Sequence, residues 1–458
     1  MKKKIEDDTK LQIKGITQEN KSNDPYSSRK KLIYFCFTFI GLANNVGYVL
    51  IITSAQQFAS KVNDDTLIAF YPLALIIFNS LSRIINSKMC IRVTYFKRAL
   101  GLSIYFCFGY LLLFTILTII DNNEGFNQKL AFFLTLIPAV IMGTGLSFGE
   151  TTFLGYIRTF PEDYVSGWSS GTGFAGVCGA SLSLLFKLIN EDFDLKYLYL
   201  IMSPITVLYF LSFYITYKIK KNIDDKNNSA KEMIEYVEEE ENEENKDIEI
   251  RKNLPENSDG LLEAENNAVR ATDVSKNKKM SFKNFPLAFK YGKRYILNLF
   301  IVYFLEYTVC SGFSERANTF KYINSKNMFF EKAQYETFLL CYQIGVFISR
   351  SSLFIFKHLA FIELLNIFQF INFIFWFIEA EKGIISNQWI CFSTLIFLGI
   401  CGGGVYVVCL YYILNDNKIP LKYKELCLNI GTIFNDLGVL LSSIVCIILD
   451  NTIMKDKN

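Results

Sequence analysis

Apolar residues along this chain gather in about eleven long stretches, which polar segments separate. Each stretch has close to the ~20 residues that an α-helix needs to cross the hydrocarbon core of a bilayer. The pattern therefore predicts an all-α integral membrane protein in contact with the lipid bilayer. The expected spans are residues 32–55, 66–86, 99–120, 130–149, 166–189, 195–217, 294–313, 337–356, 359–378, 389–412 and 426–449.

A long polar stretch separates six of these spans from the other five. It contains the acidic run EMIEYVEEEENEENKDIE, which has too little apolar surface to fold alone and is expected to be disordered. The chain then divides into a cytosolic tail (1–31), an N-terminal membrane half (32–217), a cytosolic linker (218–290), a C-terminal membrane half (291–449) and a lumenal tail (450–458).

Basic residues in the connections predict the orientation, because Lys and Arg concentrate on the cytosolic side of membrane proteins. The N-terminal tail has lysines at positions 2–4, and the second connection is also basic, whereas the connection after Asp121 has neither Lys nor Arg. The N-terminus and the second connection are therefore expected in the cytosol. The basic residues assigned to that connection are Arg83, Lys88, Arg92, Lys97 and Arg98.

The composition narrows the function further. Hydrophobic residues make up 51% of the chain and charged residues 20%, and the net charge of +3 is too small to indicate a nucleic-acid partner. The single histidine, His358, argues against a histidine-based metal site and against a Ser-His-Asp triad. We therefore expect neither an enzyme nor a metal or cofactor site.

One glycine-rich stretch, GWSSGTGFAGVCGASLSLLF (167–186), has the spacing G-x-G-x-x-G of a dinucleotide-binding turn. Such a turn needs a buried strand before it and a soluble helix after it, whereas this stretch runs directly into an apolar span. Small residues also recur here at every fourth position, which predicts a helix face for close packing in lipid. These residues are Gly167, Gly171, Ala175 and Gly179.

Polar residues inside the spans are the candidate functional residues, because an ionised side chain at mid-membrane costs about 2.5–3.5 kcal/mol even on lenient scales. The candidates for substrate binding or coupling are Asn44, Asn45, Glu150, Glu306, Arg350 and Asp436. Neutral polar residues expected along a cavity are Tyr48, Tyr342, Gln343 and Tyr406, although membrane tyrosines also serve as interface anchors.

Each ionisable candidate also has a purely structural interpretation. Glu306 could form a buried ion pair or reach the lumenal interface, or it could exchange a proton from within a water-poor cavity. Asp436 could accept hydrogen bonds from a helix end, and Glu150 could be a solvated helix terminus. Arg350 could anchor its helix in the cytosol, or it could bind a carboxylate or an anionic solute. For Asn44 and Asn45 the structural alternative is interhelical hydrogen bonding.

Several stretches resemble the battenin family of lysosomal membrane proteins, in the same order along the chain. They are GLANNVGYVLIITSA (41–55), WSSGTGFAGVCGAS (168–181), YFLEYTVCSGF (303–313), CYQIGVFISRSSL (341–353), GICGGGVYV (399–407) and IFNDLGVLLSS (433–443). The resemblance does not cover the first 30 residues or the linker, and the chain lacks the C-terminal prenylation-type cysteine of vertebrate members.

The resemblance implies a major-facilitator-like bundle in the lysosomal or vacuolar membrane that supports lysosomal pH and contents. It implies a transporter for small solutes, with glycerophosphodiesters and basic amino acids as the proposed cargoes and protons as a candidate coupling ion. The two halves would rock around a site near the midplane. The alternative is a non-transporting scaffold that recruits trafficking adaptors through the linker, where Leu261 and Leu262 form a dileucine-like sorting signal.

Overall fold

The computed structural model describes residues 25–60, 67–88, 93–123, 127–161, 164–189, 195–226, 284–321, 328–356, 362–385 and 387–452. Two compact units can be distinguished, and the larger consists of residues 28–214 and 282–458. The other consists of residues 1–27 and 215–281, of which the described residues 215–226 are helical. The account below concerns the larger unit, which contains both membrane halves.

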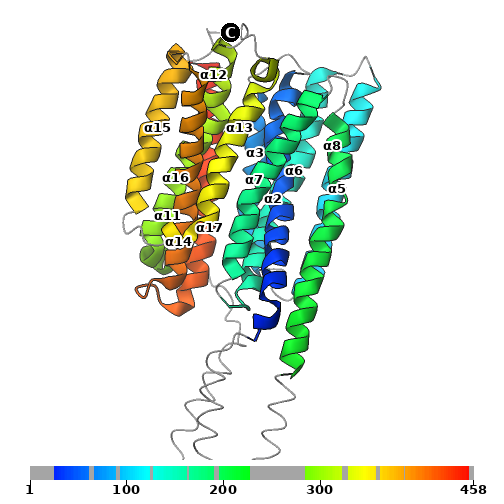
Figure 1. The fold of residues 1–458 in the computed structure, drawn as a ribbon, viewed down its shortest axis with the longest axis vertical. Coiled ribbons are helices and arrows are strands. Elements are labelled where there is room, and N and C mark those ends of the chain that lie inside the picture. The colour runs from blue at the N-terminus through cyan, green and yellow to red at the C-terminus, as the bar shows by residue number, and fades with distance from the viewer. Residues whose placement is uncertain are drawn as a thin grey trace, which may run out of the picture. The chain divides into compact units, whose positions relative to one another are not determined.

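The described residues form helices joined by turns (Figure 1). The N-terminal half contains η1 (Ser27–Arg29), α2 (Lys30–Ser60), α3 (Phe70–Ile76), α4 (Asn79–Lys88), α5 (Tyr95–Asp121), α6 (Gln128–Ile157), α7 (Tyr164–Ile189), α8 (Leu195–Met202) and a helix over 205–226. The C-terminal half contains α11 (Phe285–Thr308), the π-helix η5 (Val309–Phe313), α12 (Ser314–Lys321), α13 (Met328–Ser351), α14 (Leu353–Phe356), α15 (Ile362–Lys382), α16 (Gln388–Asn415) and α17 (Leu421–Asn451).

Among the described residues, nine helices are long and apolar enough to cross a membrane. The two remaining expected spans, 66–86 and 337–356, overlap the pair α3 and α4 and the pair α13 and α14, which do not meet this criterion, so the count of eleven spans stays a prediction. The first pair is interrupted at residues 77–78, and α13 carries polar residues such as Gln343 and Arg350. The protein is therefore a multi-pass membrane protein.

Helix boundaries differ from the expected spans where the sequence contains local signals. Pro204 has no backbone N–H and follows the end of α8, so the expected span 195–217 is divided into α8 and a helix that continues to residue 226. Asn127 begins α6, because its side-chain oxygen accepts hydrogen bonds from the backbone N–H of Lys129 and Leu130. Residues 218–226 and 285–290, which we assigned to the linker, are helical.

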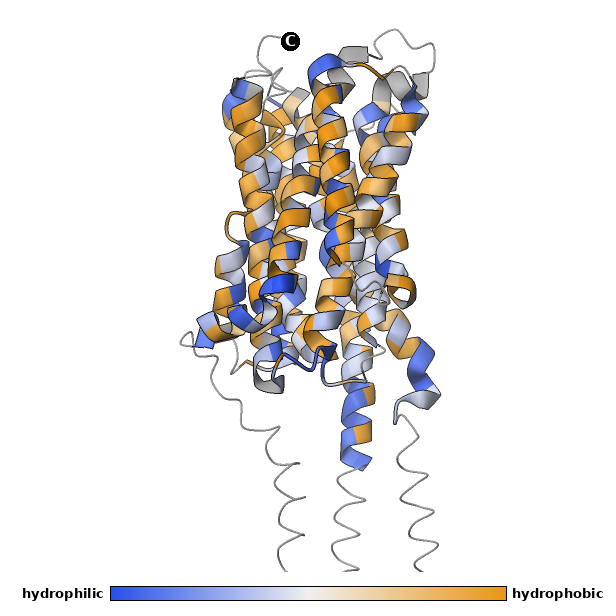
Figure 2. Ribbon diagram, turned by 90° about the vertical axis from the view of Figure 1, so that its left-hand side faces the viewer, coloured by the Kyte–Doolittle hydropathy of each residue, from blue (hydrophilic) through white to orange (hydrophobic). Residues whose placement is uncertain are grey.

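The helices present apolar side chains outward as well as inward, as expected for a surface that meets lipid. Figure 2 shows hydrophobic residues along most of the length of the helices. On α5, for example, Ile104 is 63% exposed and Phe108 55% exposed. In the bundle interior, by contrast, aromatic rings such as Trp168 and Phe153 stack with their centroids 5.9 Å apart.

Small residues on α7 allow its backbone to approach two other helices. Gly171 faces α2, and a Cβ atom at this position would overlap the backbone carbonyl of Thr38. Gly173 and Gly176 face α13 instead, where a Cβ would meet Phe347 Cα at 3.1 Å and would overlap the side chain of Gln343. The helix α7 therefore packs against both halves of the protein, and Figure 1 shows it lying between α2 and α13.

Replacing Gly171 with Ala is expected to destabilise the protein, because the new methyl group would push α2 and α7 apart. Overpacking of this kind costs about 1–3 kcal/mol. The melting temperature of the detergent-solubilised protein, measured by size-exclusion chromatography after heating, checks this expectation. Gly101→Ala is the matched control, since a Cβ at Gly101 would meet no atom within 4 Å. Equal melting temperatures for the two variants would contradict the packing interpretation.

Candidate functional site

A buried arginine joins two carboxylates in the middle of the bundle. Arg83 on α4 donates from Nε to Asp436 Oδ2 on α17 at 2.8 Å, and from Nη2 to Asp436 Oδ1 at 3.2 Å. Its Nη2 also lies 2.8 Å from Glu150 Oε2 on α6. The hydroxyl of Tyr406 on α16 donates to Glu150 Oε1 at 2.9 Å. Polar groups from both membrane halves therefore form one connected network.

The assignment of Arg83 to a cytosolic connection was wrong. Its side chain is 3% exposed, because α4 continues the line of α3 and carries the residue into the bundle. Only the later basic residues of this segment, such as Lys97 and Arg98, lie near the start of α5. The position of Arg83 explains how two carboxylates are tolerated here, since pairing with an opposite charge offsets part of the cost of burying a charge.

The side chain of Arg350 on α13 donates hydrogen bonds to neutral groups, whereas the sequence suggested a carboxylate or an anionic solute as its partner. Its Nη1 donates to Thr172 Oγ1 at 3.1 Å and its Nη2 to the hydroxyl of Tyr303 at 3.1 Å. Its guanidinium carbon lies 4.5 Å from the ring centroid of Tyr406, which is a cation–π contact. Its buried Nε has no hydrogen-bond partner among the described residues. Arg350 is thus a partly buried cation whose hydrogen bonds here go to uncharged groups.

A cavity of about 90 Å³ lies between these groups. It is lined by both arginines, both carboxylates of the network and polar residues from both halves. Eight of the candidates line it: Asn45, Tyr48, Glu150, Tyr342, Gln343, Arg350, Tyr406 and Asp436. The volume would hold about three water molecules, whereas small-molecule sites usually have ~300–1,000 Å³. A larger solute could enter only if the helices moved apart.

Two candidates do not line this cavity. Asn44 donates to the carbonyl of Leu146 at 3.1 Å and accepts a hydrogen bond from Tyr209 at 3.0 Å, which is the interhelical role. Glu306 on α11 is buried beside the cavity, where its Oε1 accepts a hydrogen bond of 2.5 Å from Tyr342. Gly402 on α16 makes room for this carboxylate, because a Cβ there would overlap it.

Two of the cavity-lining candidates, Asn45 and Tyr48, lie on α2. Asn45 donates to the carbonyl of Gly41 at 2.9 Å. The hydroxyl of Tyr48 donates to that of Tyr307 at 3.0 Å, which joins α2 to α11 across the two halves. These contacts are hydrogen bonds between neutral groups, which a solute could replace without leaving a buried charge unpaired.

The sequence analysis also missed the cavity-lining asparagines Asn79 and Asn435, together with Thr172, Tyr303 and Tyr307. Neither amide atom of Asn79 has a hydrogen-bond partner among the described residues, and the same is true of Asn435 Oδ1. Unpaired buried polar atoms are uncommon because each costs about 1–3 kcal/mol. Asn79 lies at the interruption between α3 and α4, and Asn435 directly precedes Asp436, which is the one signal that could have identified it.

The remaining predictions concern metal binding and the dileucine-like sorting signal. Within the described ranges, no three His, Cys, Asp or Glu side chains are placed to hold a metal ion. Leu261 and Leu262 lie outside the described residues, as does most of the linker. The sorting signal and the adaptor partners therefore stay predictions.

Comparison with known proteins identifies relatives over nearly the whole chain. A family model described as "CLN3 protein" matches residues 35–455. Battenin of Dictyostelium discoideum is 27% identical over 425 residues, which cover 93% of this chain and 95% of the relative. Protein BTN1 of Saccharomyces cerevisiae is 25% identical over 427 residues, which cover 92% of this chain and 94% of that relative. Battenin of Canis lupus familiaris is 26% identical over 322 residues, which cover 68% of this chain and 64% of that relative.

Solved structures with a similar fold are transporters. A D-xylose-proton symporter superposes with a TM-score of 0.56 at 12% identity, over 92% of this chain and 90% of that chain. The inward-open xylose transporter XylE of E. coli has a TM-score of 0.55 at 12% identity, over 93% of this chain and 90% of that chain. A POT family transporter has a TM-score of 0.52 at 10% identity, over 92% of this chain and 91% of that chain. At these identities the likeness concerns the fold alone, and it supports the expected major-facilitator-like architecture.

Proposed function

This chain belongs to the CLN3 protein family, and from that membership and its buried polar cavity we propose that it carries small solutes across a membrane. Movement would occur by alternating access, with the two membrane halves rocking around the cavity. The expected location is the lysosomal or vacuolar membrane, where transport would help to maintain the pH and the metabolite content of the organelle. The battenin relatives support this proposal.

The observation that carries the proposal is the network of charged groups between the two halves. Arg83 and Glu150 come from the N-terminal half, whereas Asp436, Tyr406 and Arg350 come from the C-terminal half. Charges inside a membrane protein are expensive and are usually retained where a solute or an ion passes. Contacts between the halves that consist of ion pairs and hydrogen bonds can be exchanged for contacts to water or solute as the halves separate.

The charge distribution favours an anionic cargo over a basic one. Both carboxylates of the network are already paired with Arg83, so a cationic amino acid would have to compete with a buried arginine. Arg350 donates hydrogen bonds to neutral groups in this structure, and its guanidinium can present parallel N–H donors to a phosphate. We therefore propose glycerophosphodiesters as the cargo, with basic amino acids as the second candidate.

Coupling to protons is proposed to depend on Glu306. It is buried and accepts a hydrogen bond from Tyr342, one of the cavity-lining residues. Replacing Glu306 with Gln removes the exchangeable proton but keeps an oxygen for Tyr342. We expect uptake of a labelled glycerophosphodiester into reconstituted vesicles to lose its pH dependence in Glu306→Gln. Asp436→Asn is the second variant, which also breaks the ion pair with Arg83.

The control for this experiment is Glu363→Gln. Glu363 is about half exposed and pairs with Arg294 at 2.6 Å, so its loss should leave the pH profile unchanged. If both Glu306→Gln and Asp436→Asn kept the native pH profile, neither residue would be the coupling site. If the native protein moved no labelled solute at all, the transport proposal itself would fail.

A further inference from the structure

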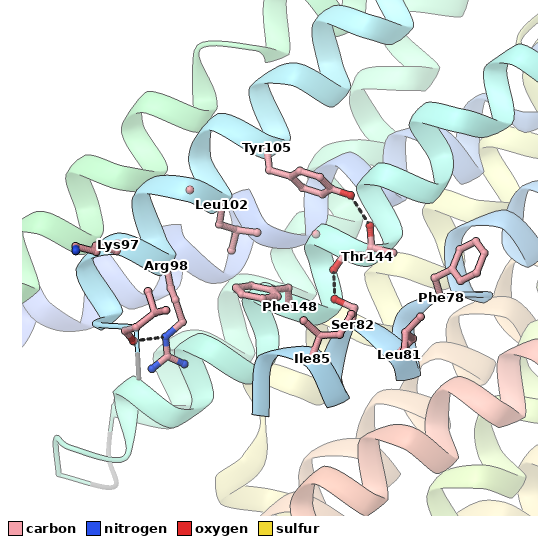
Figure 3. A pocket seen from close by; sticks show the side chains of 13 residues that line it. Phe78, Leu81, Ser82, Ile85, Lys97, Arg98, Leu102, Tyr105, Thr144 and Phe148 are labelled. Atoms are coloured by element: carbon pink, nitrogen blue, oxygen red, sulfur yellow. Dashed lines mark hydrogen bonds between the residues drawn. The ribbon is translucent and has the colours of Figure 1, made fainter. Parts of the chain in front are cut away.

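A second, larger hollow lies on the N-terminal half, away from the charged cavity (Figure 3). It is formed by α4, α5 and α6 and has a volume of about 490 Å³, within the range of small-molecule sites. We call it the α4–α6 groove. Its lining residues are Phe78, Leu81, Ser82, Ile85, Val93, Lys97, Arg98, Gly101, Leu102, Tyr105, Thr144, Gly145 and Phe148.

The body of the groove is apolar. Leu81 on α4 is 52% exposed and Phe78, just before α4, is 47% exposed, so this segment presents large hydrophobic side chains to it. The polar groups in the groove already have partners: the hydroxyls of Tyr105 and Thr144 lie 2.8 Å apart, and Ser82 donates to the carbonyl of Thr144 at 2.9 Å (Figure 3). These bonds leave a surface that suits a hydrocarbon chain.

Two basic residues lie at one end of the groove, near the start of α5. Lys97 is exposed, and Arg98 is held in place by three contacts. Its Nε donates to the carbonyl of Val93 at 3.0 Å, its Nη1 donates to Asn86 Oδ1 at 3.4 Å, and its guanidinium carbon lies 4.4 Å from the ring centroid of Tyr95. Among the described residues that line the groove, none is acidic. The groove therefore combines an apolar body with an uncompensated positive end.

The surroundings of the groove indicate that its occupant comes from the bilayer. Exposed residues beside the groove on α5, including Leu100, Ile104 and Phe108, are large and apolar. In a membrane protein such a surface faces acyl chains. The basic end belongs to the connection that the positive-inside rule assigns to the cytosol, where anionic phospholipids attract Lys and Arg.

We propose that the α4–α6 groove binds an anionic phospholipid of the cytosolic leaflet. The phosphate of the headgroup lies against Lys97 and Arg98, and one acyl chain lies between α4 and α5 along Leu81, Gly101 and Tyr105. The charge of the headgroup complements the basic end of the groove, while the apolar body accepts any acyl chain. Recognition therefore depends on the headgroup charge and requires only that the chain fits.

The experiment uses the full chain reconstituted into bilayer nanodiscs with a photoactivatable acyl chain on either phosphatidic acid or phosphatidylcholine. After irradiation, labelled peptides are identified by mass spectrometry. We expect peptides from α4 to α6 to be labelled about 25-fold more by the anionic lipid than by the neutral one. Each basic residue lost should reduce this preference about five-fold, so Lys97→Gln/Arg98→Gln should nearly abolish it.

Gly101→Leu separates the acyl site from the headgroup site. A Cβ at Gly101 would meet no atom within 4 Å, so a larger side chain fits there without strain and fills part of the groove. We expect this variant to lose labelling by both lipids while keeping the native melting temperature. Lys129→Gln, which removes an exposed lysine at the first turn of α6, is the charge control and should change nothing.

Equal labelling of the groove by the anionic and the neutral lipid would overturn the proposal, because the groove would then contain bulk lipid only. Unchanged labelling in Gly101→Leu would also overturn it, because the labelled chain would lie elsewhere. Inhibition of labelling by added inorganic phosphate, at an ionic strength matched with chloride, would indicate a free anion in place of a lipid headgroup and would likewise contradict it.

Discussion

Replacing Arg83 with Gln is expected to abolish solute uptake and to lower the melting temperature substantially. The substitution leaves Asp436 and Glu150 buried without the cation that pairs with both. Breaking a buried ion pair by removing one partner costs about 3–5 kcal/mol, a large fraction of the stability of a typical domain. Uptake into reconstituted vesicles and the melting temperature in detergent measure the two effects separately.

The double variant Arg83→Gln/Asp436→Asn distinguishes a structural role from a functional one. It removes a positive and a negative charge together, so we expect it to recover most of the lost melting temperature. Uptake should stay absent, because the contact between α4 and α17 would no longer contain charges that can be exchanged with water or solute. Arg158→Gln, at an exposed position just after α6, is the matched control. Full uptake by the double variant would show that this network is only structural.

Replacing Arg350 with Gln is expected to weaken binding of a glycerophosphodiester by at least about 30-fold. Loss of one partner of a buried, hydrogen-bonded charge pair costs about 2–5 kcal/mol, and each 1.4 kcal/mol is a factor of ten in affinity. Folding should be affected less than in Arg83→Gln, because the hydrogen bonds of Arg350 go to neutral groups in this structure. The concentration dependence of uptake gives the change in apparent affinity.

Arg350→Lys keeps the charge but loses the planar group that stacks on Tyr406 and can donate two parallel hydrogen bonds. We therefore expect it to bind the phosphodiester with an affinity between those of the native protein and Arg350→Gln. A basic amino acid as cargo would give the opposite pattern, since removing a cation from the cavity would then leave uptake unchanged or increase it. Native uptake in Arg350→Gln would remove this residue from the binding site.

The sequence predicted most of the polar residues at the cavity but not their partners. Glu150 and Asp436 were recognisable because a carboxylate inside an apolar stretch has a high cost. Arg83 lies close enough to the end of its span to be counted with the basic residues that follow it. A count of positive charges cannot tell a buried arginine from a cytosolic one. Only the packing of α4 against α6 and α17 distinguishes them.

Adjacent residues on a helix illustrate a second limit. Asn44 and Asn45 are both polar residues inside an apolar span, so the sequence does not distinguish them. Successive side chains on an α-helix, however, are separated by about 100°. Asn45 therefore lines the cavity while Asn44 bonds Leu146 and Tyr209. An apolar helix in lipid has no polar face that would indicate which direction is inward.

The glycine-rich stretch shows the same limit for packing. Residues at every fourth position predicted one close-packed face of α7, and Gly171 contacts α2 closely. The intervening Gly173 and Gly176 permit an equally close approach to α13. The spacing of small residues within one helix shows which of its faces can pack closely. The identity of the neighbouring helices depends on contacts between residues far apart in the chain.

The most direct test of the central claim is whether the cavity opens to both sides of the membrane. Val439 on α17 lines the cavity and is not one of the polar candidates, so Val439→Cys introduces a thiol there with little change in volume. A membrane-impermeant thiol reagent is applied to either face of sealed vesicles, with the native chain as background. We predict labelling from each face in turn and protection by saturating glycerophosphodiester. Labelling from one face only, or from neither, would contradict the account.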